Sequence, residues 1–387
     1  MASRRLLVAL AAATVLAALA AQSATPARGL MKGIYDEPEV LYGNPEWTFP
    51  MLSTLKADVI RVNLYWGGNK IAVADTKPAR ATDPGDPAYE WEPYDRAVLY
   101  AAQYRIQVLL SIVGTPKWAN GGKAFNYAPT KMADLRNFAF AAARRYSGTY
   151  ARVEDRRVLP RVRFWLAWNE PNNPVFLRPQ FVGSKIASGP TYAKICTAVS
   201  QGVRMTLLRK QRVACGVTAP RGNNNPASSR PSVSPLAFLR AVKKDGLKTF
   251  DAWAHHPYYA GPSDQPTTKP VTAKGAPATA VTLGNINDLI REVTRLYGNK
   301  RIWITEYGYQ TNPPDKLYGV TYAKQAAYLT QAFAIARKNP RIDMMLWFLL
   351  KDDPNVNGWQ SGLITARGAK KPAFTAFRKM ATPTRTR

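Results

Sequence analysis

Short apolar segments alternate with longer amphipathic segments along most of the chain. In the longer segments apolar residues recur at intervals of three and four, for example at Leu135, Phe138 and Ala142. This spacing predicts helices with one buried face, at residues 49–56, 94–104, 135–142, 192–203, 236–244, 286–296, 322–338 and 373–380. The shorter segments are rich in β-branched and aromatic residues, which predicts strands at residues 30–35, 59–65, 106–113, 162–168, 213–218, 250–255, 301–305 and 344–349.

The predicted strands and helices form about eight successive pairs. Strands that are apolar on both faces are typical of a buried parallel sheet, and eight strand–helix pairs predict a closed (β/α)8 TIM barrel. A doubly wound open sheet is the alternative, but no glycine-rich phosphate-binding turn follows the first strand. Because no linker separates the pairs, we expect a single domain. Long loops after the fifth and sixth strands lie at the end of the barrel where such proteins keep their sites.

The first residues have the layout of a secretory signal peptide. Arg4 and Arg5 precede an uncharged apolar run from Leu6 to Ala20, and small residues follow it. We therefore predict a signal peptide at 1–23, a secreted protein, and a catalytic barrel domain at 24–387. An apolar run of 15 residues would reach only about 22 Å as a helix, less than the ~30 Å hydrocarbon core, so no stable membrane insertion is predicted.

The high positive charge of the chain limits the kinds of binding partner that the sequence predicts. The chain has 54 Lys and Arg residues against 25 Asp and Glu residues, a net charge of +29. Such a field attracts anionic polymers, for example those of a cell wall, and the alternative is a solvated basic surface without a partner. Nucleic-acid binding is not predicted, because no zinc-finger, RNP or basic-leucine pattern accompanies the charge.

Cysteine and histidine are too few for a structural metal site. The two cysteines, Cys196 and Cys215, lie in a predicted helix and a predicted strand, and the two histidines are the adjacent His255 and His256. In a secreted chain the cysteines could form a disulfide, or each could be a small buried hydrophobic residue; the sequence leaves both open. Their spacing fits no zinc motif, and we expect neither a metal nor another cofactor.

Two carboxylates stand where the fourth and seventh predicted strands end. Glu170 follows the apolar run at 164–168, and Glu306 follows the run at 301–305. In a closed eight-stranded barrel both side chains would lie at the same mouth. Two facing carboxylates are the equipment for cleaving a glycosidic bond, since one protonates the leaving oxygen while the other attacks the anomeric carbon or activates water.

The motifs around these residues resemble those of clan A glycoside hydrolases. WNEPN at 168–172 resembles the clan's fourth-strand Asn-Glu-Pro signature, and TEYG at 305–308 is similar to its seventh-strand nucleophile segment. HPY at 256–258 resembles the sixth-strand His-x-Tyr pattern, and TPKWA at 115–119 is similar to segments of family 39 and related family 5 proteins. SIVG at 111–114 departs from family 5, whose members often carry a His at the end of the third strand.

The resemblance implies a retaining glycosidase that acts on a carbohydrate. It gives Glu170 the role of acid/base and Glu306 that of nucleophile, with six further residues contacting the sugar or the carboxylates: Arg61, Trp118, Asn169, His256, Tyr258 and Trp347. Two alternatives remain: a transglycosylase that uses the same site, and a non-catalytic glycan-binding barrel. Intact carboxylates argue against the second alternative.

Overall fold

A computed structural model describes residues 29–259, 261, 264–270 and 280–380 of the chain. The predicted signal peptide lies outside these residues. Among the helices that are described, none is long and apolar enough to cross a membrane.

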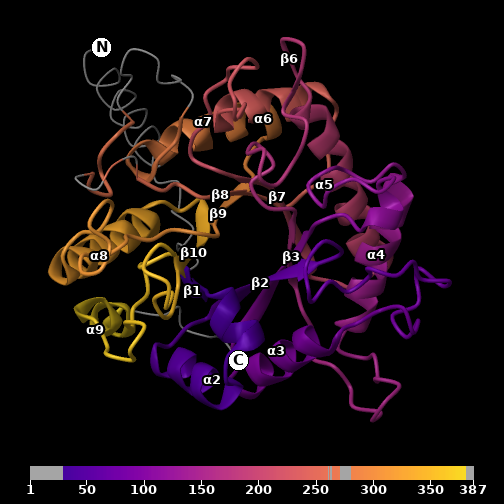
Figure 1. Ribbon diagram of the computed structural model, residues 1–387, viewed down its shortest axis with the longest axis horizontal. Coiled ribbons are helices and arrows are strands. Elements are labelled where there is room, and N and C mark those ends of the chain that lie inside the picture. The colour runs from indigo at the N-terminus through magenta and orange to yellow at the C-terminus, as the bar shows by residue number, and fades with distance from the viewer. Residues whose placement is uncertain (1–28, 260, 262–263, 271–279, 381–387) are drawn as a thin grey trace, which may run out of the picture.

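The centre of the fold is a closed barrel of eight parallel strands in the order β1-β10-β9-β8-β7-β4-β3-β2 (Figure 1). Its closure is the pairing of β1 with β10, in which Met31 lies opposite Met344 and Tyr35 opposite Phe348. The barrel strands are β1 Met31–Tyr35, β2 Val59–Tyr65, β3 Gln107–Val113, β4 Phe164–Ala167, β7 Arg212–Thr218, β8 Ala252–His255, β9 Arg301–Ile304 and β10 Ile342–Phe348. The predicted (β/α)8 barrel is therefore confirmed.

Helices surround the strands as an outer layer (Figure 1). Each predicted helix is present, as α2 Pro45–Thr54, α3 Glu92–Gln103, α4 Met132–Arg145, α5 Ser188–Met205, α6 Pro235–Lys244, α7 Ile286–Tyr297, α8 Tyr322–Lys338 and α9 Pro372–Lys379. Short elements were not predicted, because they are too short to show a period. They are the hairpin of β5 Phe181–Val182 and β6 Lys185–Ile186, a π-helical turn Pro38–Tyr42, and 3-10 turns Lys117–Ala119 and Leu283–Asn285.

Alternation along each strand decides which side chains enter the barrel. On β2, Ile60, Val62 and Leu64 pack in the core between the sheet and the helices, whereas Val59 packs in the interior of the barrel. Since successive strand residues face opposite sides, Arg61 also faces inward. The barrel wall thus holds the arginine in the interior, toward the mouth.

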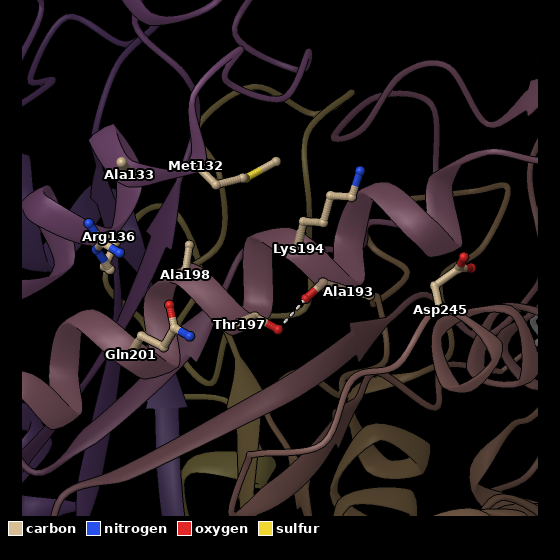
Figure 2. A pocket seen from close by; sticks show the side chains of 9 residues that line it. All are labelled: Met132, Ala133, Arg136, Ala193, Lys194, Thr197, Ala198, Gln201 and Asp245. Atoms are coloured by element: carbon tan, nitrogen blue, oxygen red, sulfur yellow. Dashed lines mark hydrogen bonds between the residues drawn. The ribbon is translucent and has the colours of Figure 1, made fainter.

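A cavity of about 230 Å³ lies outside the barrel (Figure 2). Residues of α4 and α5 form most of its lining, and Asp245 follows α6. These elements belong to the outer layer, so this cavity is separate from the ends of the strands.

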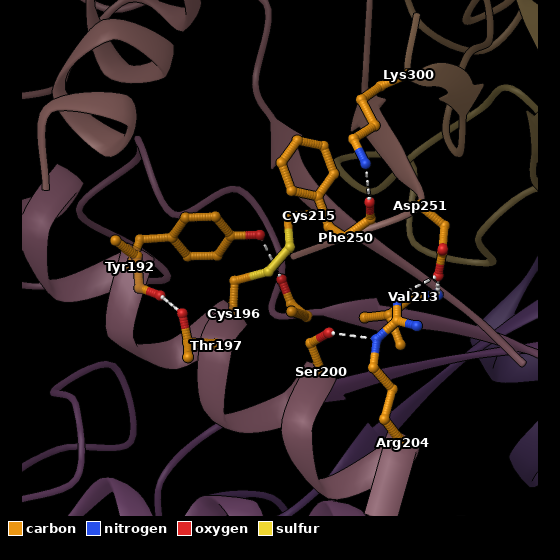
Figure 3. The surroundings of a disulfide bond; sticks show 12 residues. Tyr192, Cys196, Thr197, Ser200, Arg204, Val213, Cys215, Phe250, Asp251 and Lys300 are labelled. Atoms are coloured by element: carbon orange, nitrogen blue, oxygen red, sulfur yellow. Dashed lines mark hydrogen bonds and ion pairs between the residues drawn. A yellow bond between two sulfur atoms is a disulfide. The ribbon is translucent and has the colours of Figure 1, made fainter. Parts of the chain in front are cut away.

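A disulfide between Cys196 on α5 and Cys215 on β7 ties the outer layer to the barrel (Figure 3). The two Cα atoms are 6.0 Å apart, within the usual range for a disulfide, and both residues are fully buried. The bonded state, which the sequence left open, is the one observed. Nearby, Arg204 of α5 donates to Asp251, which also accepts from the backbone of Val213.

Removing this disulfide with the double substitution C196A/C215A should lower the free energy of unfolding by about 3 kcal/mol, because a cross-link over 19 residues restricts the unfolded chain by roughly that amount. Urea denaturation measures this change in the free energy of unfolding. The samples are the oxidised protein, the protein refolded under reducing conditions and the double variant. The last two should unfold at similar urea concentrations. Equal midpoints for the oxidised and reduced wild type would contradict a stabilising bond.

Candidate active site

Glu170 stands on an irregular segment that follows β4. Trp168 and Glu170 have φ values of 73° and 37°, in the left-handed region that is costly for residues other than glycine. Backbone hydrogen bonds to neighbouring strands hold both residues there: Trp168 donates to Ile112 at 2.8 Å, and Glu170 donates to Val217 at 2.9 Å. The segment is therefore fixed from both sides, and it presents the Glu170 carboxylate at the mouth of the barrel.

Glu306 follows β9 and forms an ion pair with Arg61. Its Oε1 accepts a hydrogen bond from Nη1 of Arg61 at 2.7 Å, and its Oε2 accepts one from the Tyr258 hydroxyl at 3.2 Å. Nη2 of Arg61 donates to Oδ1 of Asn169 at 2.7 Å. The guanidinium is fully buried. Through its two hydrogen bonds Arg61 connects Glu306, the nucleophile candidate, to Asn169, which precedes the acid/base candidate Glu170.

His256 lies between the two carboxylates. Its Nε2 is 3.1 Å from Nη1 of Arg61 and 3.0 Å from Oγ1 of Thr305, and its Nδ1 is 3.0 Å from Oε1 of Glu170. Burial outweighs the opposing charge of Glu306 and lowers the pKa of His256 to about 3, so the ring is neutral at pH 7. A guanidinium can only donate; Nε2 is thus the acceptor and Nδ1 carries the hydrogen, which it donates to Glu170.

The two carboxylates are close together. One oxygen of Glu170, one oxygen of Glu306 and one ring nitrogen of His256 all lie within 4.8 Å of one another. These are donor types that bind metals, but Arg61 contacts both Glu306 and His256. Its positive charge would repel a cation from the same atoms. The cluster therefore fits proton transfer and nucleophilic attack better than metal binding.

Burial raises the pKa of Glu170 to about 7, although the hydrogen bond from Asn173 and the charge of Arg61 act in the opposite direction. Nδ2 of Asn173 donates to Oε2 of Glu170 at 3.2 Å. A carboxyl group with a pKa near neutrality can donate a proton in one step and accept one in the next. Glu170 thus has the protonation behaviour expected of an acid/base.

Aromatic rings form one side of the mouth. Tyr258 and Phe348 lie 5.7 and 5.2 Å from the ring of Trp359, centroid to centroid. Trp359 is 44% exposed and belongs to the loop between β10 and α9. An exposed indole beside the Glu306 partner Tyr258 offers a surface on which the apolar face of a sugar ring can pack.

Two residues predicted to contact substrate lie elsewhere. Trp347 is on the outer face of β10, in the core against the helices, and its fully buried indole donates to the Ser361 carbonyl at 2.8 Å. The strand alternation explains this position, since the next residue, Phe348, packs on the inner side. Trp118 is half-buried, packs edge-on against Trp66 and donates to the carbonyl of Ala74. Among the described residues, no hydrogen bond or ring contact joins Trp118 to the carboxylates.

The structure adds residues that the sequence analysis missed. Nη2 of Arg61 also donates to Oδ1 of Asn63 at 3.2 Å, and Nδ2 of Asn63 donates to Oε2 of Glu37 at 3.0 Å. Asn63 is two residues beyond Arg61 on β2, and Glu37 is two residues beyond Tyr35, an inward residue of β1. A period of two applied to β2 would have placed Asn63 on the inner face with Arg61, whereas Glu37 lies beyond the end of β1 in a helical conformation, where no strand period applies.

A cavity of about 500 Å³ lies among the loops after β2 and β3. Its lining is Gly68, Asn69, Lys70, Asp75 and Lys117. The Tyr42 hydroxyl donates to Asn69, and Lys70 lies over the ring of Tyr42, so the loop after β1 adjoins the lining. The cavity is at the same end of the barrel as the carboxylates, because all these loops follow carboxyl ends of strands.

Comparison with known proteins places the fold. A family of unknown function (DUF5722) matches residues 233–387, and no curated protein matches the chain. A family 39 glycoside hydrolase from Bacteroides cellulosilyticus has a similar structure, with a TM-score of 0.61 and 19% sequence identity; the match covers 91% of this chain and 63% of that one. A monomeric beta-xylosidase from Caulobacter crescentus matches with a TM-score of 0.60 and 17% identity, over 91% of this chain and 67% of that one. A fungal beta-1,4-galactanase matches with a TM-score of 0.57 and 13% identity, over 91% of this chain and 100% of that one.

The chain therefore spans less than two thirds of the family 39 enzyme from Bacteroides cellulosilyticus and the whole length of the galactanase. At these identities the likeness concerns the fold. The protein has the (β/α)8 barrel of family 39 glycoside hydrolases and related glycosidases.

The buried acid should make stability depend on pH. The folded pKa of Glu170, about 7, exceeds its ordinary value of 4.5, so between these values the folded protein keeps a proton that the unfolded chain releases. The stability that the protonated Glu170 contributes to the folded protein is fully present below pH 4.5 and is lost as the pH rises through 7. The E170Q variant, which cannot ionise, should therefore be more stable than wild type at pH 8 by up to about 3 kcal/mol, with little difference at pH 4.5.

Thermal and urea unfolding at both pH values measure this difference, and E292Q is a control of opposite sign. Arg295 and Arg240 lower the pKa of Glu292 to about 2, so its contribution is present above pH 4.5 and is lost as the pH falls through 2. E292Q should thus be less stable than wild type at pH 8. An E170Q effect that is the same at pH 4.5 and pH 8 would show that Glu170 has no raised pKa.

Proposed function

We propose that this protein is a secreted glycoside hydrolase that cleaves O-glycosidic bonds with retention of configuration. The observation that carries the proposal is the pair of close carboxylates, Glu170 and Glu306, with oxygens within 4.8 Å of each other. Retaining enzymes hold their carboxyl groups about 5–5.5 Å apart, whereas inverting enzymes need about 6.5–9.5 Å to admit a water molecule. One oxygen of each carboxyl group lies within 4.8 Å of the other, and this close approach fits the narrower, retaining spacing better than the wider, inverting one.

In the first step Glu306 attacks the anomeric carbon while Glu170 protonates the leaving oxygen. Arg61 and Tyr258 donate to the two oxygens of Glu306 and aim the carboxylate at the sugar. Below about pH 7 Glu170 is protonated in the folded protein, so the proton is available where the C–O bond breaks. The products of this step are a glycosyl ester on Glu306 and a free leaving group.

In the second step Glu170, now a carboxylate, accepts a proton from water while the water oxygen attacks the anomeric carbon and the ester breaks. His256 donates from Nδ1 to Glu170 and is held by Arg61 on its other nitrogen. It therefore orients the carboxylate and remains neutral throughout. Asn169, which accepts from Arg61, stands next to Glu170 with its amide hydrogens available to a sugar hydroxyl.

The comparisons support this reaction class, because the proteins that share the barrel are named as a family 39 glycoside hydrolase, a beta-xylosidase and a beta-1,4-galactanase. The N-terminal sequence supports secretion. Attraction between the basic surface and an anionic wall polymer would bring the protein to its substrate, and it should weaken as salt rises past about 0.1 M.

Glu306→Gln should reduce turnover by at least about a thousandfold in a protein that still folds, because the amide keeps the shape of the side chain but cannot form the ester. Its melting temperature should fall, because the buried guanidinium of Arg61 loses its charged partner. Hydrolysis of nitrophenyl glycosides and release of reducing ends from polysaccharides measure turnover. E90Q, the same chemical change at an exposed position after β2, is the matched control and should keep wild-type rates. Normal activity in folded E306Q would refute the nucleophile assignment.

Glu170→Ala should behave differently. A nitrophenol leaving group needs little protonation, so the first step survives, and the second slows because no base activates water. Added azide should restore turnover and give a glycosyl azide of retained configuration, which NMR identifies. E306Q should show no such rescue. If azide fails to restore E170A, another residue is the acid/base; a product of inverted configuration from wild type would exclude double displacement.

A further inference from the structure

A third carboxylate, Glu37, lies at the same mouth and has no role in the reaction described above. Its Oε1 accepts from the Tyr65 hydroxyl at 2.9 Å. Its Oε2 accepts from Tyr65 at 3.0 Å, from Nδ2 of Asn63 at 3.0 Å and from the Tyr35 hydroxyl at 3.4 Å. Three side chains from β1 and β2 thus fix its orientation.

The Oε1 atom of Glu37 can accept a further hydrogen bond. An ionised carboxyl group has about four acceptor positions, and among the described residues Oε1 has a single donor, Tyr65, which it shares with Oε2. Asn63 and Tyr35 beneath it are buried, whereas Glu37 and Tyr65 are only partly buried. The unused acceptor position of Oε1 therefore lies in the part of this cluster that a ligand can reach.

Glu37 is also close to the catalytic carboxylates along the hydrogen-bonded chain. Asn63 accepts from Arg61, which donates to Glu306, so two side chains separate Glu37 from the nucleophile candidate. Tyr35, which contacts Glu37, lies 5.4 Å from Phe348, and Phe348 packs against the exposed Trp359. Glu37 therefore adjoins the part of the mouth where a sugar ring held between Glu170 and Glu306 would lie.

We propose that Glu37 determines specificity by accepting hydrogen bonds from hydroxyls of the sugar whose bond is cleaved, and that this sugar is neutral. The inference rests on the proposed function and deepens it by naming the substrate class. A carboxylate accepts strongly from hydroxyl groups. It repels a second carboxylate at the same place, so a uronic acid with its acidic group toward Glu37 is excluded.

The test is a double-mutant cycle in which the Glu37 side chain and one substrate hydroxyl are removed separately and together, and the effects on kcat/KM are compared. Wild type and E37Q are compared on the best nitrophenyl glycoside from a panel of neutral sugars, on its monodeoxy analogues and on the matching uronide. For the intact glycoside E37Q should lower kcat/KM about 10- to 100-fold, the value of a hydrogen bond to a charged group. For the analogue that lacks the contacted hydroxyl, the two proteins should differ less than threefold. E37Q should also narrow the gap between the neutral glycoside and the uronide.

E39Q is the matched control, because Glu39 lies two residues further on, is also partly buried and pairs with Lys351. It should leave every ratio unchanged. If E37Q lowers kcat equally for all substrates, deoxy analogues included, Glu37 is only a positioning residue for Arg61 and the proposal is wrong. A melting temperature far below wild type would be followed by E37D, which keeps the charge and should retain the preference for neutral sugars.

Binding separates this inference from the proposed function. The same cycle measured by calorimetry in the E306Q background requires no turnover, and the intact glycoside should bind more weakly to the E37Q/E306Q protein than to E306Q alone, with no such difference for the deoxy analogue. If the wild type hydrolyses the glycoside but neither cycle shows coupling between Glu37 and a substrate hydroxyl, the inference about Glu37 is wrong and the proposed function stands. A coupled binding cycle without hydrolysis by wild type overturns the proposed function alone, and no binding of any glycoside overturns both.

Discussion

The site depends on one buried positive charge, the guanidinium of Arg61. Taking a charge out of water costs several kcal/mol unless partners compensate it. Here Glu306, Asn169 and Asn63 accept from it, and its guanidinium carbon lies 4.5 Å from the centre of the Tyr35 ring. Each partner comes from a strand or strand end of the barrel. The arginine is therefore stable only if the barrel closes correctly, and a closed barrel fixes the carboxylate that Arg61 contacts.

The same dependence explains the strained backbone at the mouth. Trp168, Glu170, Val217 and Leu349 have positive φ values, and each lies at or near the carboxyl end of a barrel strand. Such conformations cost about 1–3 kcal/mol each and persist where the surroundings over-determine them. Hydrogen bonds between neighbouring strand ends do so here, since Glu170 donates to Val217 and Leu349 donates to Tyr35. The scaffold thus maintains at the site a geometry that the local sequence would not adopt alone.

The sequence predicted the barrel because buried parallel strands and amphipathic helices leave strong periodic signals. The position of the two glutamates also followed, since a residue just past a barrel strand lies at the mouth whatever the details of the strand. Side-chain direction was harder, because it depends on which face of a strand each residue takes. Trp347 and Phe348 are adjacent and both aromatic, and only the register of β10, which is irregular between Ile342 and Met344, turns Phe348 inward and Trp347 outward.

The charge at the mouth is opposite to that of the protein as a whole. The chain carries +29 with only 25 acidic residues, yet Glu37, Glu170 and Glu306 are linked through Arg61, Asn63 and His256 at one end of the barrel. One guanidinium cannot balance three carboxylates. Burial raises the pKa of Glu170 to about 7, which lessens the charge that Arg61 must offset. Because burial keeps the ring of His256 neutral, Glu170 is the member of this cluster whose protonation reduces the negative charge as the pH falls through about 7, and the proposed acid/base role places a proton at the same position.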